Sequence, residues 1–482
     1  MSIQREKIQA LEQVARQLEP ASDPREELLG RVGGYVHEFL ETLPDAQTYC
    51  PDSGESAVLS TDFPEHATPL KTLLHEFRVS VNGPGINAAS GGHMGYIPGG
   101  GVYPSALGDY LADATNRFAG IAFASPGAVR MERALIRWMA DLVGYPPGAG
   151  GDLTSGGSIA NLSALVTARE SHAIRSGVIP TAPIYMTAQV HHCIDKALRI
   201  AGLSECPRRV VPMDDRYRMD VGALSAMVQA DCDQGLRPWL IVASAGTTDL
   251  GAVDPVEELA RVAEEYGLWL HLDAAYGGFF LLCEEGRSIL GQMGLADSIV
   301  MDPHKGLFLP YGSGALLVKD VHQLACAHSY EAHYMQDAKH AVTDYSPADI
   351  SPELSRPFRG VRLWLPLKLL GLEPFRAALA EKIWLARYFY ERIAAVPGFE
   401  LGPEPDLSVV TYRYVPEHGD ANEFNQRLLA RILEDGKVFV SSTSLDGVFT
   451  LRLAVLNFRT HLEHVDYLVE LLVREAERLE KE

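Results

Sequence analysis

Between residues 127 and 318 the chain alternates between short apolar runs and longer segments with a helical period. The run at 238–244 has the length of a buried strand, whereas 255–266 repeats its apolar residues at the spacing of one helix face. Strands separated by helices favour a mostly parallel sheet with both faces covered, so we predict an α/β fold. The expected helices are 127–144, 158–176, 192–202, 221–231 and 255–266, and the expected strands are 183–188, 208–212, 238–244, 268–272, 297–301 and 314–318.

The regions on either side of this core have different patterns. Residues 1–80 are polar and helical in pattern, with too few apolar residues for a core of their own, so we expect a helical dimerisation arm. Residues 88–105 are rich in Gly, Ser and Pro, which favours a binding loop over a linker. A long helix over 361–394, followed by a strand–helix–strand–strand–helix pattern, predicts a small α+β domain. The expected domains are 1–80, 81–360 and 361–482.

An acid ends one predicted strand, and a lysine follows the next strand along the chain. The strand at 268–272 leads to Asp273, and the strand at 297–301 leads to Lys305. A lysine amine can form a Schiff base with the aldehyde of pyridoxal 5'-phosphate (PLP), and a carboxylate can hold the pyridine nitrogen protonated. Each residue alone is weak evidence, because acids are common at this edge of α/β sheets and most loop lysines are surface charges. Together they favour a PLP site.

Residues 153–161 read Leu-Thr-Ser-Gly-Gly-Ser-Ile-Ala-Asn and precede a helical pattern. Glycines at a helix start leave backbone N–H groups available to a phosphate, beside the positive end of the helix dipole. Gly157 and Ser158 are therefore candidate phosphate ligands, and an ordinary helix cap by Ser155 or Ser158 is the alternative. Neither a Walker loop nor a Gly-x-Gly-x-x-Gly fingerprint occurs at this place.

The composition excludes several other classes of protein. A net charge of −21 argues against nucleic acid or an anionic membrane as partner. No apolar run reaches the length of about 18 residues that a spanning helix needs, and the start of the chain lacks the apolar core of a signal peptide. The six cysteines are scattered without a Cys-x-x-Cys pair, which indicates reduced thiols, no metal site and a cytoplasmic location.

Taken together, the motifs resemble those of the group II PLP-dependent amino-acid decarboxylases. That family includes aromatic-L-amino-acid, histidine, tyrosine and glutamate decarboxylases, and the resemblance covers nearly the whole chain. It implies the fold-type-I (aspartate aminotransferase) scaffold, a PLP cofactor, a homodimer and an amino-acid substrate. The motifs that carry it are His271–Tyr276 (HLDAAY), Pro303–Lys305 (PHK), Ala245–Thr248 (AGTT), His191 with Ala197, and Arg356–Arg359 (RPFR) before Leu363–Trp364.

Carried over residue by residue, the resemblance assigns most of a cofactor site. It implies that Lys305 forms the Schiff base, that Asp273 binds the pyridine nitrogen, and that His191 and Ala275 lie on the two faces of the ring. His192 is the adjacent alternative to His191. The expected contacts to the phosphate or the ring hydroxyl are Gly157, Ser158 and Thr248. His304 is expected to contact the phosphate or to orient the lysine, and a hydrogen-bonded core histidine is the alternative.

The resemblance also implies residues that act on the substrate. Tyr345 falls in the mobile loop whose tyrosine protonates the substrate carbon, although an exposed turn tyrosine is the alternative. Tyr96 and Pro98 match the stretch that lines the substrate pocket, which in this family can act across the dimer interface. Arg452 matches an arginine near the substrate, and a structural strand arginine is the alternative. The implied reaction is decarboxylation of an L-amino acid to its amine, with Tyr345 as the proton donor.

Two positions depart from the family pattern, and several readings stay open. Asp302 stands where many members have Asn, and we assign it no phosphate contact because a carboxylate beside a dianion is costly. Gly306 stands where many members have a bulky residue, so we expect an enlarged or reshaped pocket edge. We expect an aromatic substrate, with an acidic one second because of Arg452. The alternatives are an aldehyde synthase, a transaminase and a non-catalytic binding protein.

Overall fold

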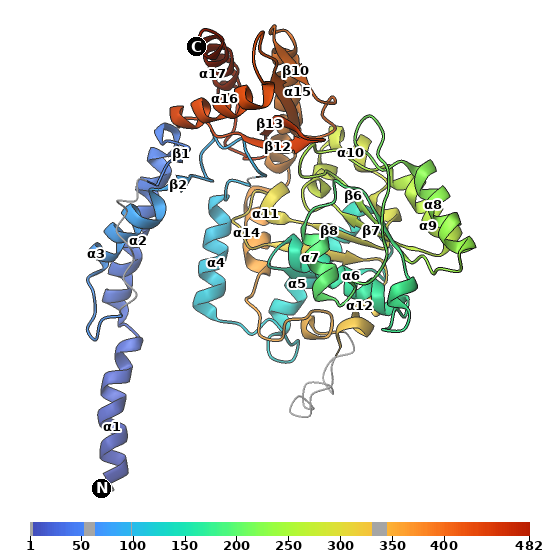
Figure 1. The fold of residues 1–482 in the computed structure, drawn as a ribbon. Helices are drawn as coiled ribbons and strands as arrows, with labels where there is room; N and C mark the ends of the chain where they lie inside the picture. Colours follow the sequence, from blue (N-terminus) through green and yellow to red (C-terminus); the bar gives the residue numbers. More distant parts are fainter. Residues whose placement is uncertain (1–2, 53–62, 98, 330–344) are drawn as a thin grey trace. The chain divides into compact units, whose positions relative to one another are not determined.

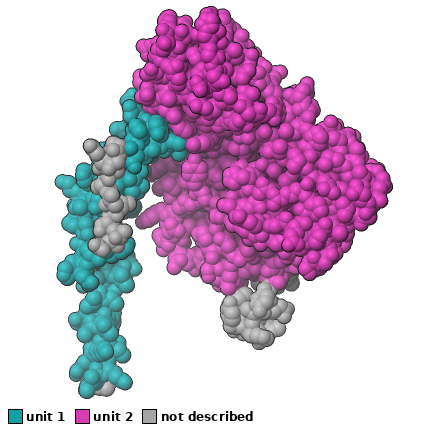
Figure 2. Space-filling view, in the orientation of Figure 1, with its two compact units in different colours: residues 1–90 teal, residues 91–482 magenta. Residues whose placement is uncertain are grey.

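The computed structural model describes residues 3–52, 63–97, 99–329 and 345–482. The chain divides into two compact units, residues 1–90 and residues 91–482, which are coloured separately in Figure 2. Within the described ranges, no helix combines the length and the apolar character needed to cross a membrane.

The first unit consists of helices and one pair of very short strands. Its three α-helices contain no buried residue. Apolar side chains such as Ile8 and Leu11 are instead more than 60% exposed (63% and 61%). A unit of this kind cannot derive much stability from its own core. The elements are α1 (Ile3–Ala15), α2 (Ser22–Thr42), β1 (Tyr49–Cys50), α3 (Leu70–Phe77) and β2 (Gly85–Ile86).

The second unit is built around a seven-stranded sheet with the strand order β3-β9-β8-β7-β6-β4-β5 (Figure 1). Strands β4 to β8 pair in parallel, which agrees with the predicted α/β fold, whereas β9 is antiparallel to both β8 and β3. Because β9 is antiparallel to both of its neighbours, β3 runs in the same direction as β8. Strand β3 therefore ends at the same edge of the sheet as β7 and β8. The strands are β3 (Gly150–Thr154), β4 (Ile184–Met186), β5 (Arg208–Val210), β6 (Leu240–Ser244), β7 (Trp269–Asp273), β8 (Ser298–Met301) and β9 (Gly314–Val318).

Helices cover both faces of this sheet, and alternate residues of its strands enter two different hydrophobic clusters. In β6, Leu240 and Val242 pack with α6 and α7, whereas Ile241 and Ala243 pack with α5, α8 and α9 on the other face. Strands buried on both faces have no polar side, which explains their unbroken apolar runs. The helices are α4 (Tyr103–Thr115), α5 (Pro126–Val143), α6 (Gly157–Ser171), α7 (Cys193–Ile200), α8 (Val221–Asp233), α9 (Val256–Tyr266), α10 (Glu284–Leu290), α11 (Pro303–Gly306), α12 (Val321–His328) and α14 (Gly360–Leu370).

The C-terminal part forms an antiparallel sheet with the order β10-β11-β13-β12, packed against helices. The single long helix predicted over 361–394 is wrong, because α14 ends at Leu370 and a second helix begins at Glu373. Gly371 between them has φ +73°, a conformation that cannot continue an α-helix. The elements are α15 (Glu373–Ala394), β10 (Phe399–Leu401), β11 (Val409–Tyr414), α16 (Ala421–Asp435), β12 (Ser441–Leu445), β13 (Val448–Ala454) and α17 (Leu462–Glu480).

A buried ionic cluster fixes β3 just before the site. The Arg356 guanidinium donates to Asp152 Oδ1 at 2.5 Å and to the Leu153 carbonyl at 2.8 Å, and it lies 3.2 Å from Glu132 Oε2. Burial raises the pKa of Glu132 to about 7, although Arg356 opposes this rise. The RPFR motif that marked the family resemblance therefore holds the end of β3 in place.

Candidate active site

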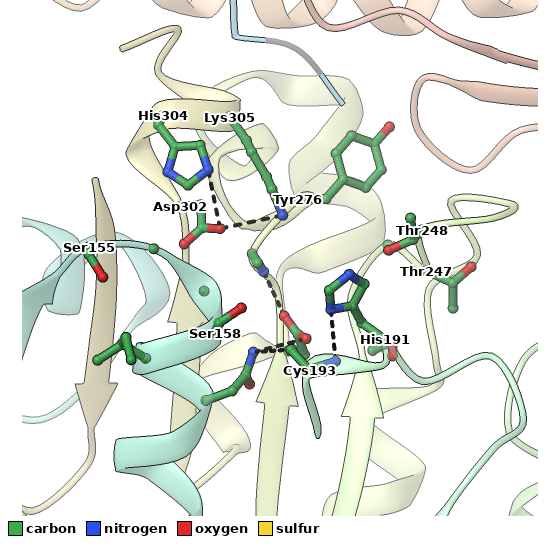
Figure 3. A pocket seen from close by; sticks show the side chains of 18 residues that line it. Ser155, Ser158, His191, Cys193, Thr247, Thr248, Tyr276, Asp302, His304 and Lys305 are labelled. Carbon is green, nitrogen blue, oxygen red and sulfur yellow. Dashed lines mark hydrogen bonds and ion pairs between the residues drawn. The ribbon is translucent and has the colours of Figure 1, made fainter. Parts of the chain in front are cut away.

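A cavity of about 260 Å³ lies where β3, β6, β7 and β8 end (Figure 3). This is the carboxyl edge of the parallel strands, where open α/β sheets bind their ligands. Eight of the predicted site residues line this one cavity, although they come from distant parts of the chain. They are Gly157, Ser158, His191, Thr248, Asp273, Ala275, His304 and Lys305.

Lys305 lies on α11, a single helical turn that directly follows β8. Its side chain is 25% exposed and points into the cavity, and its Nζ lies 3.4 Å from Asp302 Oδ2 (Figure 3). Asp302 itself is 1% exposed, and its Oδ1 has no hydrogen-bond partner among the described residues. The cavity therefore contains an amine that can react with an aldehyde, next to a buried carboxylate.

Asp273 is the last residue of β7 and is 8% exposed. Its Oδ1 accepts a hydrogen bond from the Ala275 N–H at 3.1 Å, and its Oδ2 accepts one from Asn161 Nδ2 at 3.1 Å. These two hydrogen bonds fix the orientation of the buried carboxyl group. An ionised carboxylate at this place can hold a ring nitrogen in its protonated state.

His191, and not His192, lies in the cavity wall. Its Nδ1 accepts a hydrogen bond from the Cys193 N–H at 3.3 Å, which places the ring proton on Nε2. Burial lowers the pKa of His191, with an opposing contribution from Asp273, so the ring is neutral near pH 7. A flat neutral ring of this kind suits stacking on an aromatic cofactor.

The start of α6 forms a narrow cradle. Gly156 has φ +152° and ψ 175°, a conformation that is essentially restricted to glycine. No side chain caps the helix, so neither Ser155 nor Ser158 acts as the N-cap that was the alternative interpretation. A Cβ on Gly157 would lie 2.9 Å from Asp302 Oδ2 and 3.3 Å from Ala275 Cβ. Backbone N–H groups at an uncapped helix start are well suited to a phosphate group.

The pyridoxal-dependent decarboxylase conserved domain matches residues 53–415 of this chain. The chain belongs to the pyridoxal-dependent decarboxylase family. Among its relatives, an aromatic-L-amino-acid decarboxylase of Bacillus atrophaeus is 32% identical over 431 residues, which cover 88% of this chain and 89% of the relative. Tyrosine decarboxylase 2 of Arabidopsis thaliana is 32% identical over 438 residues, which cover 87% of this chain and 80% of the relative.

Solved structures support the same assignment. The crystal structure of Oryza sativa TDC with PLP and tryptamine superposes with a TM-score of 0.90 at 27% identity, and the match covers 96% of this chain and 99% of that one. The predicted family, the fold-type-I scaffold, the PLP cofactor and the class of PLP-dependent amino-acid decarboxylase are thereby confirmed. The amine, the carboxylate, the flat histidine and the helix-start cradle of the cavity also fit this cofactor.

Two further residues of the decarboxylase complete the cavity wall near the cradle. His304 donates from Nδ1 to the Ser313 carbonyl, and its Nε2 lies 3.7 Å from Asp302 Oδ2. Burial lowers the pKa of His304, although Asp302 opposes this effect. Asp302, to which we assigned no phosphate contact, lines the cavity beside Gly157 and lies 3.4 Å from Lys305 Nζ, and its relation to the phosphate stays a prediction. Thr248 lines the opposite side (Figure 3).

Tyr96 and Arg452, which were predicted to contact the substrate, and Tyr345, the predicted proton donor, do not line this cavity. Arg452 is 3% exposed and donates from Nη1 to Ser441 Oγ at 2.9 Å and from Nη2 to the Tyr96 carbonyl at 3.2 Å. Tyr96 as a residue is 58% exposed. Pro98 lies outside the described residues. The hydroxyl of Tyr345 lies 2.8 Å from Nδ1 of His322, a residue of α12 outside the cavity wall.

Gly306, for which we expected an enlarged or reshaped pocket edge, is not among the residues that line the cavity. A Cβ at this position would lie 2.7 Å from the Cβ of Phe279. Phe279 is fully buried and stacks on Trp138, with ring centroids 6.4 Å apart and an interplanar angle of 19°. Phe279 therefore fills the space beside α11, and only a glycine at position 306 allows Phe279 to pack this closely.

The sequence interpretation missed several residues of the cavity wall. Asn161 and Cys193 face Asp273 and His191, and Tyr276 extends the wall towards the C-terminal domain through its hydroxyl, 2.6 Å from Ser408 Oγ. Asn161, which stands among Ile159, Ala160 and Leu162 near the start of α6, was the available signal, because an asparagine buried there needs hydrogen-bond partners. The other lining residues to which the sequence interpretation assigned no cofactor contact are Ser155, Gly156, Ile159, Ser244, Gly246, Thr247 and Asp302.

Gly157→Ala is expected to weaken PLP binding, because the added Cβ would approach Asp302 and Ala275 in the cradle. Overpacking of this kind costs about 1–3 kcal/mol, which corresponds to roughly tenfold or more in the dissociation constant. Titration of the apoenzyme with PLP, followed by absorbance, measures this constant. Gly177→Ala is the matched control, since a Cβ at Gly177 meets no atom within 4 Å. Equal affinities for both variants would contradict the cradle assignment.

Proposed function

We propose that this decarboxylase converts an aromatic L-amino acid into the corresponding amine and CO₂. The observation that carries the proposal is the convergence of Lys305, Asp273 and His191 on one cavity. When bound there, PLP would supply an electron sink for the carbanion that remains after CO₂ has left the substrate. Lys305 would hold the cofactor and later release the product, Asp273 would keep the pyridine nitrogen protonated, and the neutral ring of His191 would cover one face of the cofactor.

Relatives support the aromatic preference. Besides the two relatives already described, tryptophan decarboxylase 1 of Oryza sativa is 31% identical over 466 residues. Decarboxylation of an acidic amino acid is the second candidate, because Arg452 is a buried cation whose Nε has no hydrogen-bond partner among the described residues. In both cases we propose Tyr96, Pro98 and Arg452 as the substrate-side residues, together with the cavity wall.

The nearest rival reaction is oxidative deamination to an aldehyde. Phenylacetaldehyde synthase of Arabidopsis thaliana is 29% identical over 463 residues, covering 92% of this chain. The two reactions differ in whether the carbanion receives a proton or meets oxygen. We propose Tyr345 as the proton donor. Its hydroxyl bonds to His322, so this role requires Tyr345 to exchange that contact for the substrate.

We also propose a homodimer in which residues 1–80 form the dimerisation arm. The helices α1, α2 and α3 bury none of their residues, yet they carry exposed apolar side chains. Burial of such side chains against a second copy would supply the stability that the arm cannot derive from a core of its own. A cytoplasmic location is part of the same proposal and is supported by the six cysteines, which are all free thiols in the structure.

Lys305 is expected to be the lysine that binds PLP covalently. Borohydride reduction of the holoenzyme, followed by peptide mapping, should place the pyridoxyl label on Lys305. Lys305→Ala should fold normally but release almost no CO₂ from any of the twenty amino acids, because it lacks the reactive amine. Lys368→Ala, at an exposed position of α14, should retain full turnover and the same label.

The same amino-acid screen tests the substrate class. The wild-type enzyme should form amine fastest from an aromatic amino acid. Faster turnover of glutamate or aspartate would replace the aromatic proposal by the acidic one. A label on another lysine would reject the role of Lys305.

Tyr345→Phe should leave PLP binding and CO₂ release largely intact while it removes the proton donor. The product should then shift from amine towards aldehyde, ammonia and peroxide, which quantitative product analysis in air detects. His322→Leu is the control, because it breaks the same Tyr345 contact but retains the phenol. Wild-type amine formation without peroxide in the Phe variant would show that the proton comes from another group.

Ile8→Asp combined with Leu11→Asp should weaken the dimer by at least about tenfold, because two charges would replace apolar side chains on α1. Sedimentation velocity over a concentration series measures this change. Gln13→Glu, on the same helix, should leave the association constant unchanged within error. A fully active wild-type monomer would refute the dimer proposal.

A further inference from the structure

Five buried side chains form a continuous hydrogen-bond chain that ends at Asp273. Trp269 Nε1 donates to Ser298 Oγ at 2.9 Å, and Ser298 Oγ lies 2.8 Å from His271 Nδ1. His271 Nε2 lies 2.7 Å from Asn161 Oδ1, and Asn161 Nδ2 donates to Asp273 Oδ2 at 3.1 Å. All five side chains are less than 9% exposed. We refer to these five residues as the Trp269 chain.

In the Trp269 chain, every hydrogen bond is donated in the same direction, from Trp269 towards Asp273. The indole N–H of Trp269 can only donate, so Ser298 Oγ accepts from it. The described part of the protein offers the Ser298 hydroxyl one acceptor, His271 Nδ1, and the hydroxyl proton therefore points to that nitrogen. Burial lowers the pKa of His271 to about 4, so the ring is neutral and carries its proton on Nε2. That proton is donated to Asn161 Oδ1.

The orientation of the Asn161 amide follows from this direction. Because Oδ1 accepts from His271, the NH₂ group must face Asp273. Its two hydrogens have two acceptors, Asp273 Oδ2 at 3.1 Å and Cys193 Sγ at 3.4 Å. A flipped amide would turn Oδ1 towards the Asp273 carboxylate and would place an N–H donor against the N–H of His271. Only one orientation satisfies every group in this buried site.

We propose that the Trp269 chain fixes the Asn161 amide as a hydrogen-bond donor and thereby holds the Asp273 carboxylate oriented towards the pyridine nitrogen of PLP. Trp269, Ser298 and His271 act through Asn161, so they are positioning residues. The proposal rests on the role of Asp273 that was proposed above. It explains why the strand that leads to Asp273 contains a fully buried histidine. His271 accepts the hydrogen bond that follows from the Trp269 donor and in turn donates to Asn161.

The protonation state of the pyridine nitrogen is the direct test. Holoenzymes reconstituted with ¹⁵N-labelled PLP report it through the nitrogen chemical shift. The wild type should show a protonated nitrogen. Asn161→Leu should shift the signal towards the unprotonated value and lower kcat by about tenfold, with a smaller change in KM, because Asp273 loses one donor. Ser298→Ala should produce a smaller shift in the same direction, although three hydrogen bonds separate residue 298 from the acid.

Two further variants separate this effect from a general loss of packing. Ser298→Thr retains the hydroxyl and should restore the wild-type nitrogen signal. Thr167→Val alters another fully buried hydroxyl on α6 whose hydrogen bond stays within the helix, and it should leave the signal unchanged. If Asn161→Leu fails to fold, the Ser298 pair still decides the question.

The outcome for Asp273→Asn distinguishes the two proposals. If this variant shifts the nitrogen signal but Asn161→Leu and Ser298→Ala do not, the Trp269 chain has no positioning role and the proposal is overturned. If Asp273→Asn itself leaves the signal unchanged, the assigned role of Asp273 fails first. A graded shift, largest for the Asp273 variant and smallest for Ser298→Ala, supports both.

Discussion

The candidate active site depends on one constraint of the sheet, which is that β3, β6, β7 and β8 all end at the same edge. Strand β9 is antiparallel to both of its neighbours and so restores the direction of β8 in β3. The cradle at Gly157, the acid Asp273 and the amine Lys305 therefore reach one cavity from distant parts of the sequence. Gly157 begins α6, Asp273 ends β7 and Lys305 lies in the helical turn after β8, so the backbone position of each group is set by strand pairing and helix packing.

Burial determines the charge state of the groups around this cavity. Carboxylates that are removed from water need donors or cations, and they have them: Asp273 accepts two N–H groups, and Asp302 faces Lys305. The histidines of the cavity are neutral instead of charged, because burial lowers the pKa of His191 and His304. The site thus combines fixed negative charge with neutral aromatic rings.

The sequence predicts the parallel part of the sheet well, because strands buried on both faces appear as continuous apolar runs. Strand β3 was missed because it contains two glycines and an acid. Its Gly151 lies against β9 so closely that a Cβ would come within 2.0 Å of the Leu316 carbonyl oxygen.

Motifs located Lys305 and Asp273, since their chemistry restricts the residue types. They could not reveal Asn161, whose role follows from contacts with residues more than a hundred positions away.

The packing of Phe279 on Gly306 has a consequence for how this family can vary. The two positions share one volume beside the lysine turn, and in this chain Phe279 fills it. A Cβ at 306 would lie 2.7 Å from the Cβ of Phe279, an atom that every residue except glycine carries. Shortening the side chain at 279 would therefore not admit a larger residue at 306 unless the backbone of one of the two segments shifts. The residue that follows the lysine is thus restricted to glycine as long as α11 and the segment of Phe279 keep this spacing.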